Sequence, residues 1–304
     1  MIFFRPIAVT NSNLTSTIPE PDASTPIPEV EWVAGSYNLG DRVIKSSTNS
    51  VYEVVADPST TDDPEVGVLK TPKTWVYVSP TNRFKMFDGA NNTQTIGDNI
   101  VVSIVPNNLA NSVACFNVNC ESITVKAFDV LNNEIYSKSI DMTSRPSVTG
   151  WYNYFYGEFI ITTRFTLLDL PPVTNGRIEI TFTGTGAAVG TCVLGKQIYM
   201  GEAQHGSGAE LIDFSPIDED KFGNVTFEGG FSARLINYDI MIDRGSVDYV
   251  FSEIRGLGKS PTVFIGDESL NSSTLSVFGF VRDFNTTYDW PTKSSASLTV
   301  RGLV

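Results

Sequence analysis

Alternation of apolar and polar residues in many short segments is the feature that most restricts the fold of this chain. Polar and apolar residues alternate from Ser122 to Ala127 in the segment 122–128 (SITVKAF) and throughout residues 177–183 (RIEITFT). Because successive side chains of a β-strand point to opposite faces, this period of two predicts strands with one buried face. Asn132 and Asn133 lie between two apolar stretches and indicate a hairpin turn. The sequence therefore predicts an all-β fold.

One segment departs from this period. In residues 246–256 (SVDYVFSEIRG), Val247, Val250 and Ile254 recur at helical spacing. Ser246 precedes them as a candidate N-cap, and the glycine at the end is a common helix stop. We expect one short helix here.

The chain of 304 residues is long enough for several domains, each with its own core. Residues 1–28 hold a short strand-like run and a Pro/Ser/Thr-rich stretch, which predict an N-terminal arm and linker, with the head of the arm docking on a neighbouring subunit. Residues 29–88 predict a small aromatic-rich β module. Residues 89–201 and 202–304 predict two β-sandwich, jelly-roll-like domains.

The charge balance restricts the partners. Acidic residues outnumber basic ones 34 to 21, giving a net charge of -13. Phosphate backbones and anionic membranes are bound through clustered Lys and Arg, so we expect no nucleic-acid partner and no membrane insertion. The sequence has neither an apolar run of roughly 20 residues nor the features of a signal peptide. We therefore expect synthesis in the cytoplasm and, if the protein leaves the cell, release by lysis.

The inventory of reactive residues argues against an enzyme. His205 is the only histidine, so a zinc site with the usual ligand spacing cannot be built, and no G-x-S-x-G motif presents a nucleophilic serine. Cys115, Cys120 and Cys192 are too few for a disulfide framework and are expected as small buried hydrophobes. We expect no catalytic residues, no metal and no cofactor.

A short acidic run leaves one alternative open. Asp218, Glu219 and Asp220, with Asp213 nearby, fit a solvated loop. Carboxylates can also bind Ca²⁺, although this spacing does not match the EF-hand loop, or form a catalytic pair.

Five large rings gather within fifty residues of the small module: Trp32, Tyr37, Tyr52, Trp75 and Tyr77. Sugar rings pack their C–H faces on aromatic faces, and a domain this small cannot bury every ring. We expect Trp32 and Tyr52 in the core. The candidate carbohydrate-binding residues are Tyr37, Trp75 and Tyr77.

A motif supports this interpretation. The pattern W-x4-Y-x2-G-D-x-V, followed by V-Y-E and a later tryptophan, is carried by Trp32, Tyr37, Gly40, Asp41, Val43, Val51, Tyr52, Glu53 and Trp75. It resembles the chitin-binding-type modules of carbohydrate-binding families 5 and 12. The resemblance implies that Tyr37 and Trp75 contribute to the sugar-facing surface. The long loop between Tyr52 and Trp75 departs from the family pattern.

The layout of the whole chain resembles a family of bacteriophage tail proteins. It runs from MIFFRPI through the module and SPTNRFKMFDG to LSVFGFVRDF and SLTVRGL. Residues 89–201 also resemble a galactose-binding-like jelly roll. These resemblances imply a virion structural protein of the tail or baseplate, forming a symmetric homo-oligomer with other tail proteins and contacting host-surface glycans. The alternatives are a scaffold without sugar binding and a polysaccharide-degrading enzyme with an appended binding module.

Overall fold

The computed structural model describes residues 1–25, 27–144, 151, 155, 160–219, 221–222, 225–227, 229–266 and 273–303. Strands make up 49% of the chain and helices 9%, which confirms the predicted all-β fold with several sheets. None of the described helices is long and apolar enough to cross a membrane.

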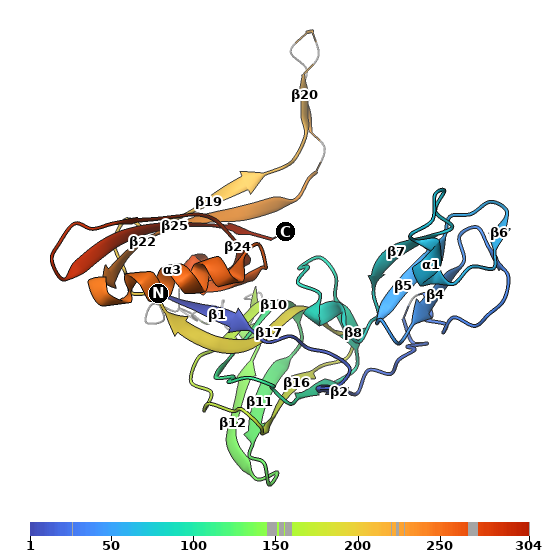
Figure 1. The fold of residues 1–304 in the computed structure, drawn as a ribbon, viewed down its shortest axis with the longest axis horizontal. Helices are drawn as coiled ribbons and strands as arrows, with labels where there is room; N and C mark the ends of the chain where they lie inside the picture. The colour runs from blue at the N-terminus through green and yellow to red at the C-terminus, as the bar shows by residue number, and fades with distance from the viewer. Residues whose placement is uncertain are drawn as a thin grey trace.

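Two large sheets organise the body of the molecule (Figure 1). The 11-stranded sheet has the order β15 (Arg164–Leu167), β10 (Ser112–Asn119), β17 (Ala187–Tyr199), β1 (Ile2–Pro6), β23 (Thr262–Ile265), β24 (Ser276–Thr287), β25 (Lys293–Gly302), β22 (Ser232–Asp243) and β18 (Glu202–Ala203), with β8 (Thr95–Gly97) on β17 and β19 (Gly208–Asp213) on β22. The 5-stranded sheet has the order β12 (Glu134–Asp141), β11 (Ser122–Phe128), β16 (Arg177–Thr183), β9 (Ile100–Ile104) and β2 (Leu14–Ser16).

The smaller elements complete the chain. The module contains β3 (Tyr37–Asn38), β4 (Arg42–Lys45), β5 (Ser50–Val54), β6 (Ser59–Thr60), α1 (Pro64–Gly67) and β7 (Trp75–Pro80). Two further ladders pair β13 (Thr143–Ser144) with β14 (Ile160–Ile161), and β20 (Ile217–Glu219) with β21 (Val225–Phe227). The described residues also include helix α3 (Val247–Leu257) and the 3₁₀ turns η1 (Lys85–Phe87), η2 (Arg244–Ser246) and η3 (Ser273–Leu275).

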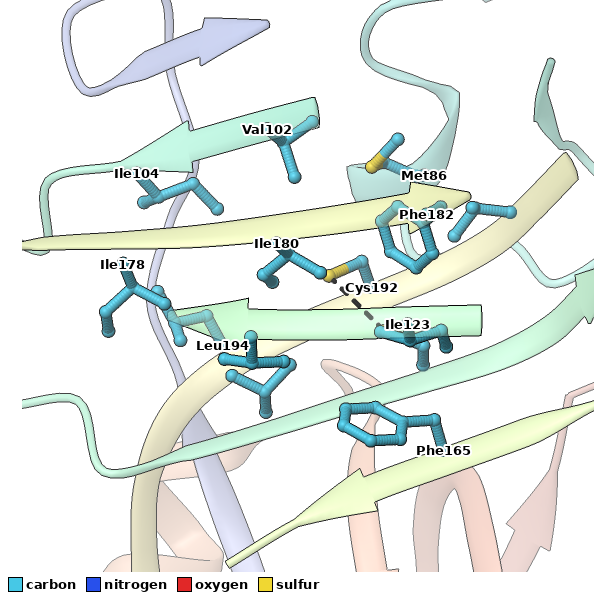
Figure 2. Close-up of a cluster of buried hydrophobic side chains, with 14 of the residues drawn as sticks. Met86, Val102, Ile104, Ile123, Phe165, Ile178, Ile180, Phe182, Cys192 and Leu194 are labelled. Atoms are coloured by element: carbon cyan, nitrogen blue, oxygen red, sulfur yellow. Dashed lines mark hydrogen bonds between the residues drawn. The ribbon is translucent and has the colours of Figure 1, made fainter. Parts of the chain in front are cut away.

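The middle of the chain is a β-sandwich, as the alternating segments predict. Strands β11, β16 and β9 turn their apolar faces toward β10 and β17, and Figure 2 shows the side chains that meet between them. Ile123, Ile180 and Phe182 have no exposed surface. The Sγ atoms of Cys115 and Cys192 lie 3.7 Å apart in this core as free thiols. The contact with Cys192, together with burial, raises the pKa of the Cys115 thiol well above its ordinary value.

The first strand joins the two halves of the large sheet, which corrects the expectation of an arm on a neighbouring subunit. β1 pairs antiparallel with β17 on one side and with β23 on the other. Its residues alternate between two cores: Phe3 packs with the C-terminal core, and Phe4 packs in a cluster on the opposite side of the sheet. Both phenylalanines are fully buried. Docking within the chain satisfies the backbone hydrogen bonds and buries both rings at once.

The C-terminal part differs from the expected sandwich. Helix α3, present where the helical spacing predicts it, lies against the sheet formed by β22, β24 and β25 (Figure 1). Its buried face consists of Val247, Val250, Ile254 and Leu257. An amphipathic helix buries the apolar face of a sheet as effectively as a second sheet does, so this part of the chain has a sheet-and-helix layer structure.

A buried asparagine connects the module to the body. The Asn82 side chain donates to Asp22 Oδ2 at 2.6 Å and to the Ile96 carbonyl at 2.8 Å, and its Oδ1 accepts from the Ile96 N–H at 3.0 Å. The linker, the end of the module and β8 are thereby held by one side chain. These hydrogen bonds give a structural role to Asn82, the first residue of the N-R-F-K-M-F segment near the end of the module.

Candidate functional site: the aromatic module

The motif residues of the module build a tight turn and a small sheet. Asp41 Oδ2 accepts a 2.7 Å hydrogen bond from the Asn38 N–H, which closes the turn before β4. Gly40 has a φ of 89°, a conformation that other residues rarely adopt. Strands β4, β5 and β7 then pair in the order β4-β5-β7. The Gly-Asp part of the Y-x2-G-D motif is therefore explained by the geometry of this turn.

Trp75 lies in the core of the module, which corrects its assignment as a sugar-binding residue. Its side chain is 0% exposed. The indole N–H donates to the Asp62 carbonyl at 3.0 Å. Gly67 lies directly against the indole, and a Cβ at that position would overlap it. A ring enclosed on this many sides cannot offer a face to a sugar.

Tyr37 is held against Trp75 and is only partly accessible. Its ring meets the indole edge-on at a centroid distance of 5.5 Å. Its hydroxyl donates to the Val33 carbonyl at 2.8 Å and accepts from the Val33 N–H at 3.1 Å. Both the ring and the hydroxyl of Tyr37 therefore have partners within the chain. These contacts suit a residue that supports the fold of the module better than one that stacks on a sugar.

Tyr77 keeps an accessible surface. Its side chain is 49% exposed, and it packs edge-on against Tyr52 with ring centroids 6.2 Å apart. Burial of the hydroxyl and the nearby Asp88 and Tyr52 raise the pKa of Tyr77, so it stays a neutral donor at physiological pH. Tyr52 is buried, as expected of a core residue, and Trp32 is half-buried with the Lys45 ammonium 5.4 Å from its ring centre.

The structure thus separates the three predicted site residues. Trp75 and Tyr37 form one edge-on pair inside the module, and Tyr77 lies near its surface. Val76 and Val78 flank Tyr77 on β7, the edge strand of the small sheet, and are also exposed. Because successive side chains of a strand point to opposite faces, the exposed ring of Tyr77 is a single aromatic contact, suited to weak binding.

Sequence reasoning missed a cleft in the module. A cleft of about 280 Å³ lies between the small sheet and the linker. Ile27 and Val30 of the linker line it, together with Val78 of β7 and the cations Arg42 and Lys85. The Pro-rich composition of the linker indicated an extended segment but gave no sign that it would cover the sheet.

The acidic run falls partly outside the described residues. Asp220 is not described, and neither are the side chains of Asp218 and Glu219, so the Ca²⁺ alternative stays a prediction. Asp213 is described: its Oδ1 accepts from the Ser215 N–H and hydroxyl, a local turn. Within the part of the chain that the structure describes, no three His, Cys, Asp or Glu side chains gather closely enough to hold a metal ion.

Comparison of the chain with models of protein families, with curated proteins and with solved structures found no match.

Proposed function

We propose that this chain is a structural subunit of a bacteriophage tail or baseplate, which assembles with copies of itself and with other tail proteins in the virion. One observation carries the assembly part of this proposal. A hairpin built from β19, β20, β21 and β22 projects from the body of the molecule (Figure 1). The tail and baseplate setting comes from the sequence layout, which resembles that family.

The projecting hairpin exposes large apolar side chains along its length. Leu211 is 64% exposed, Phe231 74% and Phe222, near the tip, 90%. Exposing apolar side chains to water is unfavourable in free energy, and a monomer that exposes them on a projection is prone to aggregate. Contact with a neighbouring subunit removes that cost. A projection on one surface that meets a different surface of the next copy generates a ring when the rotation between copies closes, which suits a part arranged around a tail axis.

The aromatic module supports glycan contact less than its motif implies. Trp75 is buried and the hydroxyl of Tyr37 is bonded within the chain, which leaves Tyr77 as the exposed ring of the three. A role as spacer or rigid attachment fits these contacts. Weak contact with host glycan through Tyr77 would still be effective when several copies act together on one particle.

We expect Phe222→Asp to weaken self-association of the full chain by about tenfold or more, since a buried aromatic anchor at an interface contributes at least that much. Sedimentation velocity over a range of protein concentrations measures the effect. Leu131→Asp is the matched control, because Leu131 is an 83% exposed apolar residue at the tip of the β11–β12 hairpin. A wild-type chain that remains monomeric at every concentration, or equal weakening by both variants, would contradict assembly through this hairpin.

A further inference from the structure

Two cysteines face each other across neighbouring strands in the core of the middle sandwich. Cys115 of β10 and Cys192 of β17 are direct partners in the antiparallel register of these strands. Their Sγ atoms lie 3.7 Å apart, and the dashed line at Cys192 in Figure 2 marks this contact. Both are free thiols. The fold therefore brings together two nucleophilic groups that are 77 positions apart in the sequence.

The backbone at this pair has the dimensions that a disulfide bond requires. Directly opposite residues of antiparallel strands have Cα atoms about 4.5–5.5 Å apart. Cysteines joined by a disulfide have Cα atoms about 4.4–6.8 Å apart. The register of Cys115 and Cys192 therefore allows a bond between the two sulfurs after rotation of the side chains, with both strands kept in their present pairing.

The third cysteine lies in a different environment. Cys120 follows the end of β10, and its thiol donates to the Ser122 carbonyl at 3.6 Å. Cys120 is 9% exposed, compared with 0% for Cys115 and 4% for Cys192. An oxidation governed by exposure alone would therefore modify Cys120 first. An oxidation governed by contact between two thiols joins Cys115 to Cys192, so the two cases can be told apart by experiment.

Burial determines which oxidant can react with the pair. The contact between the thiols, together with burial, raises the pKa of Cys115, so its thiol is protonated at physiological pH. Because the thiolate is the reactive form, the pair reacts slowly while the core is closed. The pair belongs to the same buried cluster as Phe165 and Leu194, and a close-packed core leaves no room for bulky reagents. A reagent close to water in size, such as hydrogen peroxide, is the least hindered.

We propose that Cys115 and Cys192 are an oxidation site, at which a small peroxide forms a disulfide bond that locks β10 to β17. One thiol loses its proton, and its sulfur attacks an oxygen of hydrogen peroxide, which gives a sulfenic acid and hydroxide. The released proton converts the hydroxide to water. The sulfur of the second thiol then attacks the sulfenic sulfur, the S–S bond forms, and the sulfenic hydroxyl leaves with the second thiol's proton as water. In total, two thiols and one peroxide give one disulfide and two water molecules.

A bond at this place restrains the centre of the large sheet. Strand β17 pairs with β10 on one side and with β1 on the other. The bond closes a loop over 77 sequence positions, which restricts the unfolded chain and so stabilises the folded one. In a virion part, as proposed above, the bond would form after the particle leaves the reducing cytoplasm, where disulfides rarely persist. The chemistry of the pair itself does not depend on that setting.

The test is oxidation of the purified full chain with hydrogen peroxide, followed by mass spectrometry of its peptides. The peptides of Cys115 and Cys192 should be joined with the loss of two hydrogen atoms, and dithiothreitol should separate them. Titration of thiols in denaturant should fall from three per chain to one. The thermal midpoint of the oxidised chain should rise by about 5 °C or more. These measurements use the unaltered chain, so they do not depend on the folding of any variant.

Two variants complete the test. Cys192→Ala should abolish the bond and the rise in thermal midpoint, whereas the matched control Cys120→Ala should keep both. Oxidation of Cys120 with Cys115 and Cys192 still reduced, or a disulfide that includes Cys120, would overturn the proposal. An unchanged or lowered midpoint of the cross-linked chain would overturn the locking role of the bond. The assay needs neither particles nor self-association, so it can fail while the tail proposal holds, and the reverse.

Discussion

Replacing Trp75 with alanine is expected to unfold the aromatic module while the rest of the chain stays folded. The indole is fully buried, packs against Tyr37 and donates to the Asp62 carbonyl. Truncating such a ring costs about 3–5 kcal/mol in free energy of unfolding. A module of this size has a free energy of unfolding of only about 3–9 kcal/mol. The free energy lost with the indole is therefore comparable with the whole stability of the module.

Limited proteolysis followed by mass spectrometry would detect this as new cleavage within residues 29–88. Tyr77→Ala is the control, because Tyr77 lies near the surface of the same strand and its truncation should cost below about 1 kcal/mol. The opposite ranking, with Tyr77→Ala the more damaging change, would contradict the assignment of Trp75 to the core.

The second large effect concerns β1. Phe4→Ala should lower the free energy of unfolding of the body by about 3–5 kcal/mol, because Phe4 is fully buried on a strand between β17 and β23. The Thr262 hydroxyl also donates to the Phe4 carbonyl at 2.6 Å, so a displaced strand would leave a buried hydroxyl without its acceptor. Chemical denaturation followed by circular dichroism measures the change.

A control for this prediction lies on the same strand. Arg5 has a side chain that is 55% exposed, and it forms an ion pair with Glu253, whose side chain is 11% exposed. Arg5→Ala removes no buried ring and should therefore lower the free energy of unfolding far less than Phe4→Ala does. If Phe4→Ala proved as mild as Arg5→Ala, the strand would not join the two halves of the sheet as described.

The elements of the fold could be predicted from local patterns. The alternation in residues 122–128 and 177–183 predicted strands β11 and β16, because the period of a strand depends only on neighbouring residues. Helix α3 followed from the same kind of reasoning. The position of β1 in the sheet could not be predicted in this way. Its partner strand β23 is about 260 residues away, and nothing in a short apolar run specifies which sheet edge that run joins.

The candidate site was harder to predict than the fold. The number of aromatic rings in the module was evident from the sequence. Which of them are buried was not, because Trp75 is enclosed by Gly67 and by the Asp62 carbonyl. Both residues belong to the long loop before Trp75, which departs from the family pattern. The cleft of about 720 Å³ that is lined in part by Arg164 and Arg234 gave no sequence signal at all. Arg164 and Arg234 are 70 positions apart and meet only through the curvature of the large sheet.

The central claim is that the chain is an assembled part of a virion tail. The most direct measurement is quantitative mass spectrometry with immunogold electron microscopy on particles purified from a lysate of cells that express the gene. We expect the chain at a fixed copy number per particle, with gold at the tail, and a strongly reduced copy number for Phe222→Asp but not for Tyr77→Ala. A chain found only in the particle-free fraction would contradict the claim.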